Sequence, residues 1–517
     1  MEEKDITASN SINSKSRYIG VSYGAHDYGI VVFDQEGTLI FCSQGERILR
    51  RKSHHLQETI SEQLKRAGLE SLSPNDHLFT VRPNAVGQLF AEYAFELKKD
   101  KNDFLLPYKP AFEKYNFYHV DHHLSHAAAS WMFRENYSEE DSLYLVFDGT
   151  GFKTNLKPGF YSIGTIGNNG IKEIENEKLK PRQYASSNRL DHIRLPDTNP
   201  LGVAGKLMGL AGHCTESKTI PFSEIPDFFT KCDTRFTELG NKLDEQLMTD
   251  YGTLYLSYIN DLKDQLGIIL SKYPNKNVVV GGGTFLALEL NTFIAEQGRT
   301  VLFGPPVNDS GIALGAGAFG YFLLNKKWPK NLEDPFIQWC PPQRTTPYIS
   351  PEQAAHILVD KMKPIGLIIG KGEIGPRALG HRSLLAVPTM ESKVLLSETI
   401  KVREYYRPVA PIVTDRDFPK LFTGPQGKYM QYRNHCTPLA KQLVPGVVHN
   451  DNTARAQVLE RKDNPWLYDV LVEVGKKTGA ECLINTSLNG PGKPISNTID
   501  DVKNEMDTSK FELIVMD

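Results

Sequence analysis

The stretch that sets the fold of this chain reads Leu143-Tyr144-Leu145-Val146-Phe147-Asp148-Gly149-Thr150-Gly151. Its five apolar residues predict a buried strand, and the residues from Asp148 onward predict a tight turn. A returning strand is predicted from Gly159 to Ile166, followed by a second turn over Gly167-Asn168-Asn169-Gly170. Glycines in the first turn would let backbone N–H groups face a bound phosphate.

The same layout occurs near the start of the chain. Tyr18–Ser22 is predicted as a strand, followed by the turn Tyr23-Gly24-Ala25-His26-Asp27. A second strand, Gly29–Phe33, then reaches a turn over Asp34-Gln35-Glu36-Gly37. The two leading strands begin 125 residues apart, at Tyr18 and Leu143. One such copy is common, but two copies predict a duplicated α/β architecture.

The α/β pattern continues in the middle of the chain. Val278–Val280 is predicted as a buried strand that runs into Gly281-Gly282-Gly283, and a helix is predicted over Thr284–Gln297. Val301–Phe303 is the next expected strand, and a helix of small residues is expected from Gly311 to Leu324. Glycine-rich corners at strand ends are where α/β sheets bind ligands.

The length of 517 residues exceeds one ordinary core, so more than one domain is expected. Residues 1–17 are polar and predict a flexible tail, and residues 18–324 form the first expected domain. Prolines interrupt residues 325–350, which predicts a linker, and residues 351–517 form the second expected domain. Its opening strand is predicted at Gly366–Gly370.

Composition narrows the class of protein. The net charge of -3 gives no global reason to expect nucleic acid or an anionic membrane as a partner. The six cysteines are scattered and form no CxxC, so a reducing cytosol is the expected location. The longest apolar run, Gly311–Leu324, is too short to span a bilayer. We therefore expect a cytoplasmic protein with no membrane partner.

A histidine-rich stretch gives the first indication of chemistry. Asp121 is expected to cap a helix that the alanines after His126 favour. His122 and His126 then share one helix face, four residues apart, where two imidazoles can bind one metal ion. An ordinary pair of half-buried histidines is about equally compatible, because the glutamate of the HExxH motif is missing.

The second expected domain contains the densest basic cluster. It extends over residues 370–383 and 401–408, and glycines flank Arg377 and Arg382. Guanidinium groups suit bidentate binding of phosphate or carboxylate, so an anion site is favoured. The alternative is a solvated face in which the arginines pair with nearby glutamates, namely Glu373, Glu398 and Glu404.

Taken in order, these motifs resemble the NodU/CmcH family of O-carbamoyltransferases, from about Tyr18 to the end of the chain. In the first domain the matching pieces are Gly24-Ala25-His26-Asp27, Gln44-Gly45-Glu46-Arg47, Asp121-His122-His123-Leu124-Ser125-His126, Asp148-Gly149-Thr150-Gly151, Lys206-Leu207-Met208-Gly209, Gly282-Gly283 and Asn308-Asp309-Ser310-Gly311. In the second domain they are Gly375-Pro376-Arg377-Ala378-Leu379-Gly380-His381-Arg382-Ser383, Lys401-Val402-Arg403-Glu404, Thr453-Ala454-Arg455 and Asn485-Thr486-Ser487-Leu488-Asn489.

The resemblance implies a duplicated actin-like (ASKHA) N-terminal domain followed by a YrdC-like α/β C-terminal domain. It further implies that the second domain makes carbamoyl-adenylate from carbamoyl phosphate and ATP, with Mg(2+) accompanying the ATP. The first domain would transfer the carbamoyl group to a hydroxyl of a small-molecule acceptor, a sugar or natural product, near a metal. Fe(2+) is the expected metal, with Zn or Mn as alternatives.

The resemblance also implies roles for individual residues. His122, His126 and Asp309 would bind the metal, although Asp309 also fits a helix cap. His26 is the candidate proton acceptor, with a structural turn histidine as an equal alternative. Nucleotide or phosphate binding in the first domain is expected from Asp148, Gly149, Thr150, Gly151, Lys206, Gly282, Gly283 and Asn291. Carbamoyl phosphate and ATP binding in the second domain is expected from Arg377, Arg382, Lys401, Arg407, Arg455, Asn485, Ser487 and Asn489.

The chain departs from the family pattern at Lys371, Ala287 and Leu488, where the family has arginine, asparagine and phenylalanine. Two other functions stay open at this point. One is carbamoylation of a nucleic acid, tRNA or modified DNA, which the lack of a global basic surface disfavours. The other is a non-catalytic actin-like nucleotide-binding regulator. Homodimerisation is left open, and the stretches 178–200 and 220–256 are expected to line the acceptor side.

Overall fold

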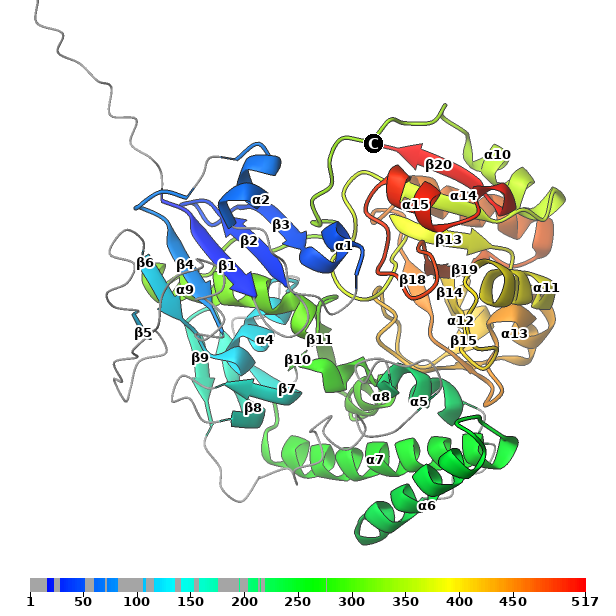
Figure 1. Cartoon of the computed structure of the whole chain (residues 1–517), viewed down its shortest axis with the longest axis horizontal. Helices are drawn as coiled ribbons and strands as arrows, with labels where there is room; N and C mark the ends of the chain where they lie inside the picture. Colours follow the sequence, from blue (N-terminus) through cyan, green and yellow to red (C-terminus); the bar gives the residue numbers. More distant parts are fainter. Residues whose placement is uncertain are drawn as a thin grey trace, which may run out of the picture.

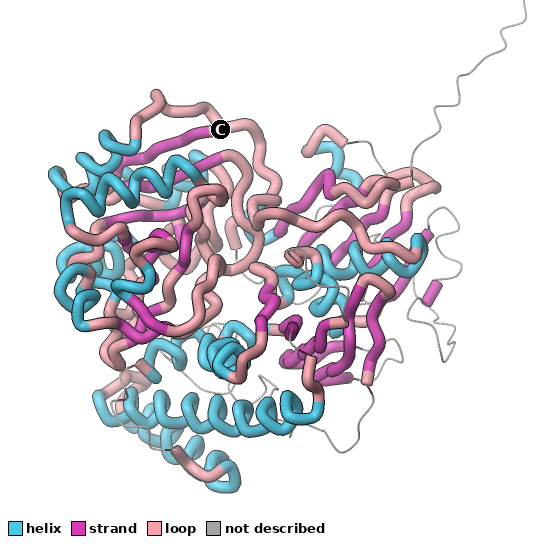
Figure 2. The backbone as a smooth tube through the Cα atoms, turned by 180° about the vertical axis from the view of Figure 1, so that it is seen from behind, coloured by secondary structure: helices cyan, strands magenta, loops and turns pink. Residues whose placement is uncertain are grey.

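The computed structural model is drawn from two opposite sides in Figures 1 and 2. It describes residues 16–22, 28–51, 60–69, 72–81, 106–107, 116–134, 141–152, 158–174, 195, 203–212, 214, 219–275 and 277–517. His26 and most of the predicted tail lie outside the described residues, as does the stretch 178–200 apart from Leu195. No helix in the described part of the chain has the length and apolar character needed to cross a membrane.

The first sheet has the strand order β3-β2-β1-β4-β6-β5. Its strands are β1 (Tyr18–Ser22), β2 (Gly29–Phe33), β3 (Leu39–Gln44), β4 (His77–Thr80), β5 (Leu106–Pro107) and β6 (Asn116–His119). β1, β2 and β3 form an antiparallel meander, and β4 and then β6 join parallel to β1.

The second sheet repeats this topology, with the order β11-β10-β7-β8-β9. Its strands are β7 (Ser142–Phe152), β8 (Pro158–Gly167), β9 (Gly170–Glu173), β10 (Asn277–Gly281) and β11 (Thr300–Phe303). β7, β8 and β9 form the antiparallel meander, and β10 and β11 join parallel to β7. The predicted duplicated, actin-like architecture is therefore confirmed.

Two helices lie between the sheets, one from each copy (Figure 1). They are α4 (His122–Trp131), which follows β6, and α9 (Ile312–Asn325), which follows β11. A β-carbon at Gly315 would overlap the backbone oxygen of Ser125, so α9 approaches α4 only because this residue is glycine. Asp121 caps α4 as predicted, since its Oδ1 accepts the Leu124 N–H at 3.0 Å.

Helices cover the other face of the second sheet. They are α5 (Val203–Ala211), α6 (Ile225–Glu238), α7 (Glu245–Lys272) and α8 (Leu288–Glu296). The long helix α7 runs along the lower edge of Figure 1 and reaches toward the second domain, where the Tyr405 hydroxyl donates to Met248 Sδ.

Two elements differ from the prediction. Strand β7 continues through Gly151, so no tight turn follows Phe147; the pairing with β8 shifts register between these two residues instead. A bulge of this kind places extra residues on one strand without ending it. The helix predicted from Thr284 is broken, because a 3₁₀ turn (Gly283–Leu286) buries Phe285 before Ala287 adopts an extended backbone.

The second domain is built on a mixed six-stranded sheet of order β18-β14-β19-β13-β12-β20. Its strands are β12 (Ile365–Ile369), β13 (Arg382–Ala386), β14 (Ala410–Thr414), β18 (Gln457–Leu459), β19 (Cys482–Ser487) and β20 (Glu512–Met516). α10 (Pro351–Ala355) and α14 (Pro465–Thr478) pack on one face. A small sheet of β15 (Phe422–Thr423), β16 (Asn434–Cys436) and β17 (Thr453–Ala454) adjoins it. The domain is α/β as predicted.

The two domains are joined by a polar interface as well as by the chain. Arg50 donates to Glu505 through Nε (2.9 Å) and Nη2 (2.7 Å), and to the backbone oxygens of Ile495 and Pro494. Residues 326–350 contain no helix or strand, but Trp339 donates its backbone N–H to Cys42 in β3 at 2.7 Å. This stretch therefore follows the edge of the first sheet on its way to the second domain.

Candidate active site

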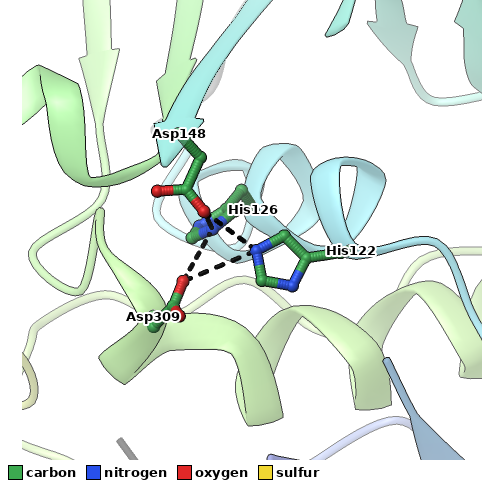
Figure 3. Close-up of side chains that lie close together, drawn as sticks. All are labelled: His122, His126, Asp148 and Asp309. Atoms are coloured by element: carbon green, nitrogen blue, oxygen red, sulfur yellow. Dashed lines mark hydrogen bonds and ion pairs between the residues drawn. The ribbon is translucent and has the colours of Figure 1, made fainter. Parts of the chain in front are cut away.

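Four side chains from three parts of the first domain converge (Figure 3). His122 and His126 come from α4, Asp148 from β7, and Asp309 from the 3₁₀ turn before α9. His122 Nε2 lies 3.0 Å from Asp148 Oδ2, and His126 Nε2 lies 3.2 Å from Asp309 Oδ1. One ligand atom from each residue lies within 4.8 Å of all the others.

The surrounding backbone holds these side chains in place. A β-carbon at Gly281 would come within 2.9 Å of His126 Cβ, so the end of β10 packs directly on α4. Asp148 Oδ1 accepts the N–H of Gly283 at 3.2 Å, which leaves Oδ2 for the histidines. The cap of the 3₁₀ turn is Asn308, so the carboxylate of Asp309 turns toward the histidines instead of capping.

The electrostatics of the cluster match those of a cation site. Burial lowers the pKa of an imidazole, but hydrogen bonds with Asp148 and Asp309 outweigh burial and raise the pKa of His126 to about 9. The pKa of His122 is raised by the same partners. Burial would raise the pKa values of Asp148 and Asp309, but the histidines hold both below the ordinary range. The two carboxylates thus favour the protonated forms of both histidines, and one divalent cation could take the place of those protons.

The donor set fits a transition metal. Two imidazoles and two carboxylates within reach of one point suit Fe(2+), Zn or Mn. The structure brings together the predicted His122, His126 and Asp309. It adds Asp148, which was predicted as a phosphate-binding residue and lies among these ligands, because β7 extends past the expected turn.

The other first-domain residues divide into two groups. Gly282 and Gly283 follow β10 beside Asp148, and Gly149, Thr150 and Gly151 lie on the extended end of β7. Lys206 and Asn291 lie elsewhere, at the domain interface. Lys206 forms an ion pair with Glu404, and Asn291 Nδ2 donates to the backbone oxygens of Phe285 (2.9 Å) and Gln431 (3.1 Å). In this structure both side chains thus make contacts across the domain boundary, and their predicted role in nucleotide binding stays a prediction.

The second domain gathers four half-buried arginines. They are Arg377, Arg403, Arg407 and Arg455. Burial, with the charge of Arg407, lowers the pKa values of Arg377 and Arg403 to about 10. Burial and the other three arginines lower the pKa of Arg455 well below its usual range. Their mutual influence shows that the four positive charges lie close together.

These arginines have less negative than positive charge around them. Among the described residues, their one ion pair joins Arg407 Nη1 and Glu404 Oε2 at 3.7 Å. The Nε atoms of Arg455 and Arg403 are buried and have no hydrogen-bond partner among those residues. Positive charge that is partly withdrawn from water and incompletely paired is costly, so the arrangement favours binding of an external anion.

Arg382 does not belong to this group, in contrast to the prediction. It is fully buried at the start of β13, and its Nε donates to the backbone oxygen of Asn497 at 3.1 Å. Its Nη1 and Nη2 donate to the backbone oxygens of Ile369, His381 and Gly370 and to Cys340 Sγ. All five N–H donors of a guanidinium are thereby used, so none is available for a phosphate.

Three predicted residues meet beside the cluster. Lys401 Nζ donates to the backbone oxygens of Ser487 (2.6 Å) and Asn489 (3.0 Å) and to Asn489 Oδ1. Asn485 Nδ2 donates to the backbone oxygen of Ala378, next to Arg377. Arg403 follows Lys401 by two residues and was missed as a site residue, although both belong to one basic stretch.

The two clusters share one boundary. The backbone of Gly375 is held by Gln44 Oε1, which accepts its N–H at 3.3 Å, and by Arg47 Nη2, which donates to its oxygen at 2.9 Å. A β-carbon at Gly375 would lie 2.5 Å from the oxygen of Pro305. Gly375 precedes Arg377 by two residues, and Pro305 precedes Asp309 by four. The loop of the anion cluster therefore packs on the turn that carries a metal-site carboxylate.

Residues 355–517 match a family model described as "Carbamoyltransferase C-terminus". The chain is 31% identical to nodulation protein U of Rhizobium tropici over 286 residues, which cover 52% of this chain and 48% of that protein. It is 25% identical to the uncharacterised protein MJ1051 of Methanocaldococcus jannaschii over 450 residues, covering 77% of this chain and 82% of that one. The chain thus spans about half the length of the nodulation proteins it matches. These matches confirm the predicted resemblance to the NodU/CmcH family.

Among solved structures, a crystal structure of HypF from T. kodakarensis aligns with 60% of this chain and 48% of that chain, at 11% identity and a TM-score of 0.37. The fold assignment therefore rests on the strand orders described above.

Proposed function

We propose that this protein is an ATP-dependent O-carbamoyltransferase. The second domain would make carbamoyl-adenylate from carbamoyl phosphate and ATP, and the first domain would transfer the carbamoyl group to a hydroxyl of a small molecule. The observation that carries the proposal is the cluster of four arginines with one paired carboxylate, located within a domain that matches the carbamoyltransferase C-terminal family.

The chemistry of the substrates fits this cluster. Carbamoyl phosphate carries a phosphate and ATP a triphosphate, and guanidinium groups bind both through paired, charge-assisted hydrogen bonds. Arg377 and Arg455, which have no anionic partner in the described structure, are the first candidates for phosphate oxygens. Positive charge at this position would also stabilise the negative charge that develops on the leaving pyrophosphate.

The first-domain cluster fits the transfer step. His122, His126, Asp148 and Asp309 would hold a divalent metal, which as a Lewis acid can polarise a carbonyl or lower the pKa of a hydroxyl. His122, His126 and Asp148 are buried, and a site with little exposure to water would protect an activated carbamoyl group against hydrolysis. The net charge of -3 gives no electrostatic reason for a nucleic acid acceptor, which favours a small molecule.

The test is a pyrophosphate-release assay on the purified protein with carbamoyl phosphate and ATP. We expect release that requires both substrates and that falls at least about 100-fold in Arg377→Gln, which removes a bidentate contact to the substrate. The matched control is Arg461→Gln, whose guanidinium is exposed and pairs with Asp469 at 2.9 Å. Folded, metal-loaded protein that releases no pyrophosphate with both substrates present would refute the proposal.

A further inference from the structure

The reaction proposed for the second domain consumes water, and its arginines cannot act as the base that accepts a proton from that water. This inference rests on the proposed function. Converting carbamoyl phosphate and ATP into carbamoyl-adenylate, inorganic phosphate and pyrophosphate consumes one water molecule. The water must cleave the bond between phosphorus and the carbamoyl oxygen, so that the freed carbamate oxygen can attack the α-phosphorus of ATP. A group beside the arginines is therefore needed to accept a proton from water.

His449 is placed for this role. Its backbone N–H donates to the oxygen of Thr453 at 2.9 Å, in a turn that leads into β17 and on to Arg455. A hydrogen bond with the backbone of Val409, two residues after Arg407, acts to raise the pKa of the ring. The ring is therefore held between the two segments that carry Arg407 and Arg455.

One ring nitrogen of His449 is buried and unpaired. Nε2 has no hydrogen-bond partner within the described residues. In the neutral ring that carries its proton on Nδ1, Nε2 keeps its lone pair. A buried imidazole nitrogen with a free lone pair, beside cations that attract a phosphate, is the arrangement a general base requires.

The charged groups around the ring keep it neutral before substrate binds. Burial lowers the pKa of His449 to about 4; Asp451 opposes this effect, and Arg455 and Lys393 add to it. Asp451 is itself engaged by Arg433 Nη2 at 2.8 Å and by the Thr453 hydroxyl at 2.7 Å. A bound phosphate dianion would offset the positive charges and make the ring a stronger base at the moment of reaction.

We propose that His449 is a catalytic residue, the general base for cleavage of carbamoyl phosphate at the arginine cluster. Nε2 takes one proton from water while the water oxygen forms a bond to phosphorus. The bond from phosphorus to the carbamoyl oxygen breaks, and its electron pair leaves on the carbamate. The water oxygen remains on inorganic phosphate with the second proton, and the proton on His449 passes to solvent.

The test compares two routes to carbamoyl-adenylate in His449→Gln. Cleavage of carbamoyl phosphate needs the base. Carbamate, supplied as ammonium carbamate, is the product of that cleavage and so bypasses the step. We expect pyrophosphate release from carbamoyl phosphate and ATP to fall about 100-fold or more, and release from carbamate and ATP to stay within about threefold of wild type. The control is His435→Gln, an exposed histidine on the neighbouring strand β16, which should change neither rate.

Each outcome separates this inference from the proposed function. Unchanged carbamoyl phosphate turnover in His449→Gln, or equal loss by both routes, would overturn the role of His449 while leaving the transferase proposal standing. Wild-type protein that uses neither carbamoyl phosphate nor carbamate would overturn the proposed function itself. Wild-type turnover in ¹⁸O-water provides a check independent of variant folding: label should appear in inorganic phosphate, and label in the carbamoyl group instead would contradict the step.

Discussion

Replacement of Arg455 by methionine should stabilise the ligand-free protein and weaken its response to polyphosphate. The side chain is half-buried among three other arginines, and within the described structure it has no anionic partner. Methionine keeps an apolar stem of similar length and removes the charge. The variant therefore relieves repulsion in the empty site and removes a phosphate contact from the filled one.

The neighbouring arginines indicate the size of the effect. The pKa values of Arg377 and Arg403 are lowered to about 10, against an ordinary value of roughly 12.5, which corresponds to about 3 kcal/mol disfavouring the charged form. Burial accounts for the largest share, and partial exposure screens the remainder. We expect the unfolding free energy of Arg455→Met to exceed that of wild type by about 1–2 kcal/mol. For a domain of this size, each kcal/mol should raise the melting temperature by about 2–4 °C.

The response to ligand should move in the opposite direction. Tripolyphosphate at 100 times its wild-type dissociation constant should stabilise the wild-type protein by about 2.7 kcal/mol. Loss of one charge-assisted contact should weaken binding about 10–100-fold, so the same concentration should stabilise Arg455→Met by only about 0.4–1.4 kcal/mol. Thermal melts with and without tripolyphosphate measure both effects.

The matched control is Arg461→Met, which removes an exposed guanidinium paired with Asp469. Its unfolding free energy should change by less than about 0.5 kcal/mol, and its response to tripolyphosphate should match wild type. If Arg455→Met instead destabilises the ligand-free protein by more than about 1 kcal/mol and keeps the full tripolyphosphate response, Arg455 is structural and the anion site is misplaced.

Four further changes have defined outcomes. Asp148→Asn should reduce retained metal at least about tenfold after dialysis, measured by elemental analysis, and wild-type metal content would exclude Asp148 as a ligand. Arg50→Ala should lower the free energy of unfolding in urea by about 3 kcal/mol, because Glu505 stays buried at the interface without its partner. Glu404→Gln removes the carboxylate that pairs with Arg407, so inorganic phosphate should bind about 3–10-fold more tightly by calorimetry, and weaker binding would contradict this. The pKa of His449 is about 4 in the folded state, against 6.5 when unfolded, so the unfolded state binds more protons between these values. The unfolding free energy of wild type should therefore fall as the pH drops from 6.5 toward 4. The fall should be steeper than in His449→Gln, by up to about 1.4 kcal/mol per pH unit.

Local patterns in the sequence were enough to predict the duplicated fold. Each copy begins with a strand, a returning strand and a tight turn, and these elements depend on neighbouring residues alone. The pairing of His122 with His126 was equally predictable, since it follows from helix periodicity. Asp121 caps that helix in the structure as its position before the alanines indicated.

The role of Asp148 could not be predicted in this way. Its side chain points to the histidines because β7 continues past Phe147, and because Gly283, in the 3₁₀ turn after β10, donates to its other oxygen. The first fact depends on the pairing of β7 with β8, and the second on the pairing of β7 with β10, more than 100 residues away in the sequence. A residue at the end of a strand can serve a turn or a site, and only long-range pairing decides between them.

The arginines of the second domain show the same limit. Arg377 and Arg382 are five residues apart and both lie beside glycines, so the local pattern predicts the same anion-binding role for both. Strand β13 begins at Arg382 and buries its guanidinium among backbone oxygens, whereas Arg377 lies on the loop before the strand. The contact of Lys206 was unpredictable for a related reason, since its partner Glu404 belongs to the other domain.

The contrast in charge between the two clusters would favour movement of carbamoyl-adenylate from the second-domain cluster to the first-domain cluster. The first-domain cluster balances two histidines against two carboxylates, whereas the second-domain cluster has four arginines and one paired carboxylate. Under the proposed function, the arginines bind substrates with several negative charges each, but carbamoyl-adenylate carries only one. The arginines would therefore attract carbamoyl-adenylate less strongly than they attract either substrate. Because the loop before Arg377 packs on the turn before Asp309, a weakly held intermediate would reach the metal cluster across a single domain boundary.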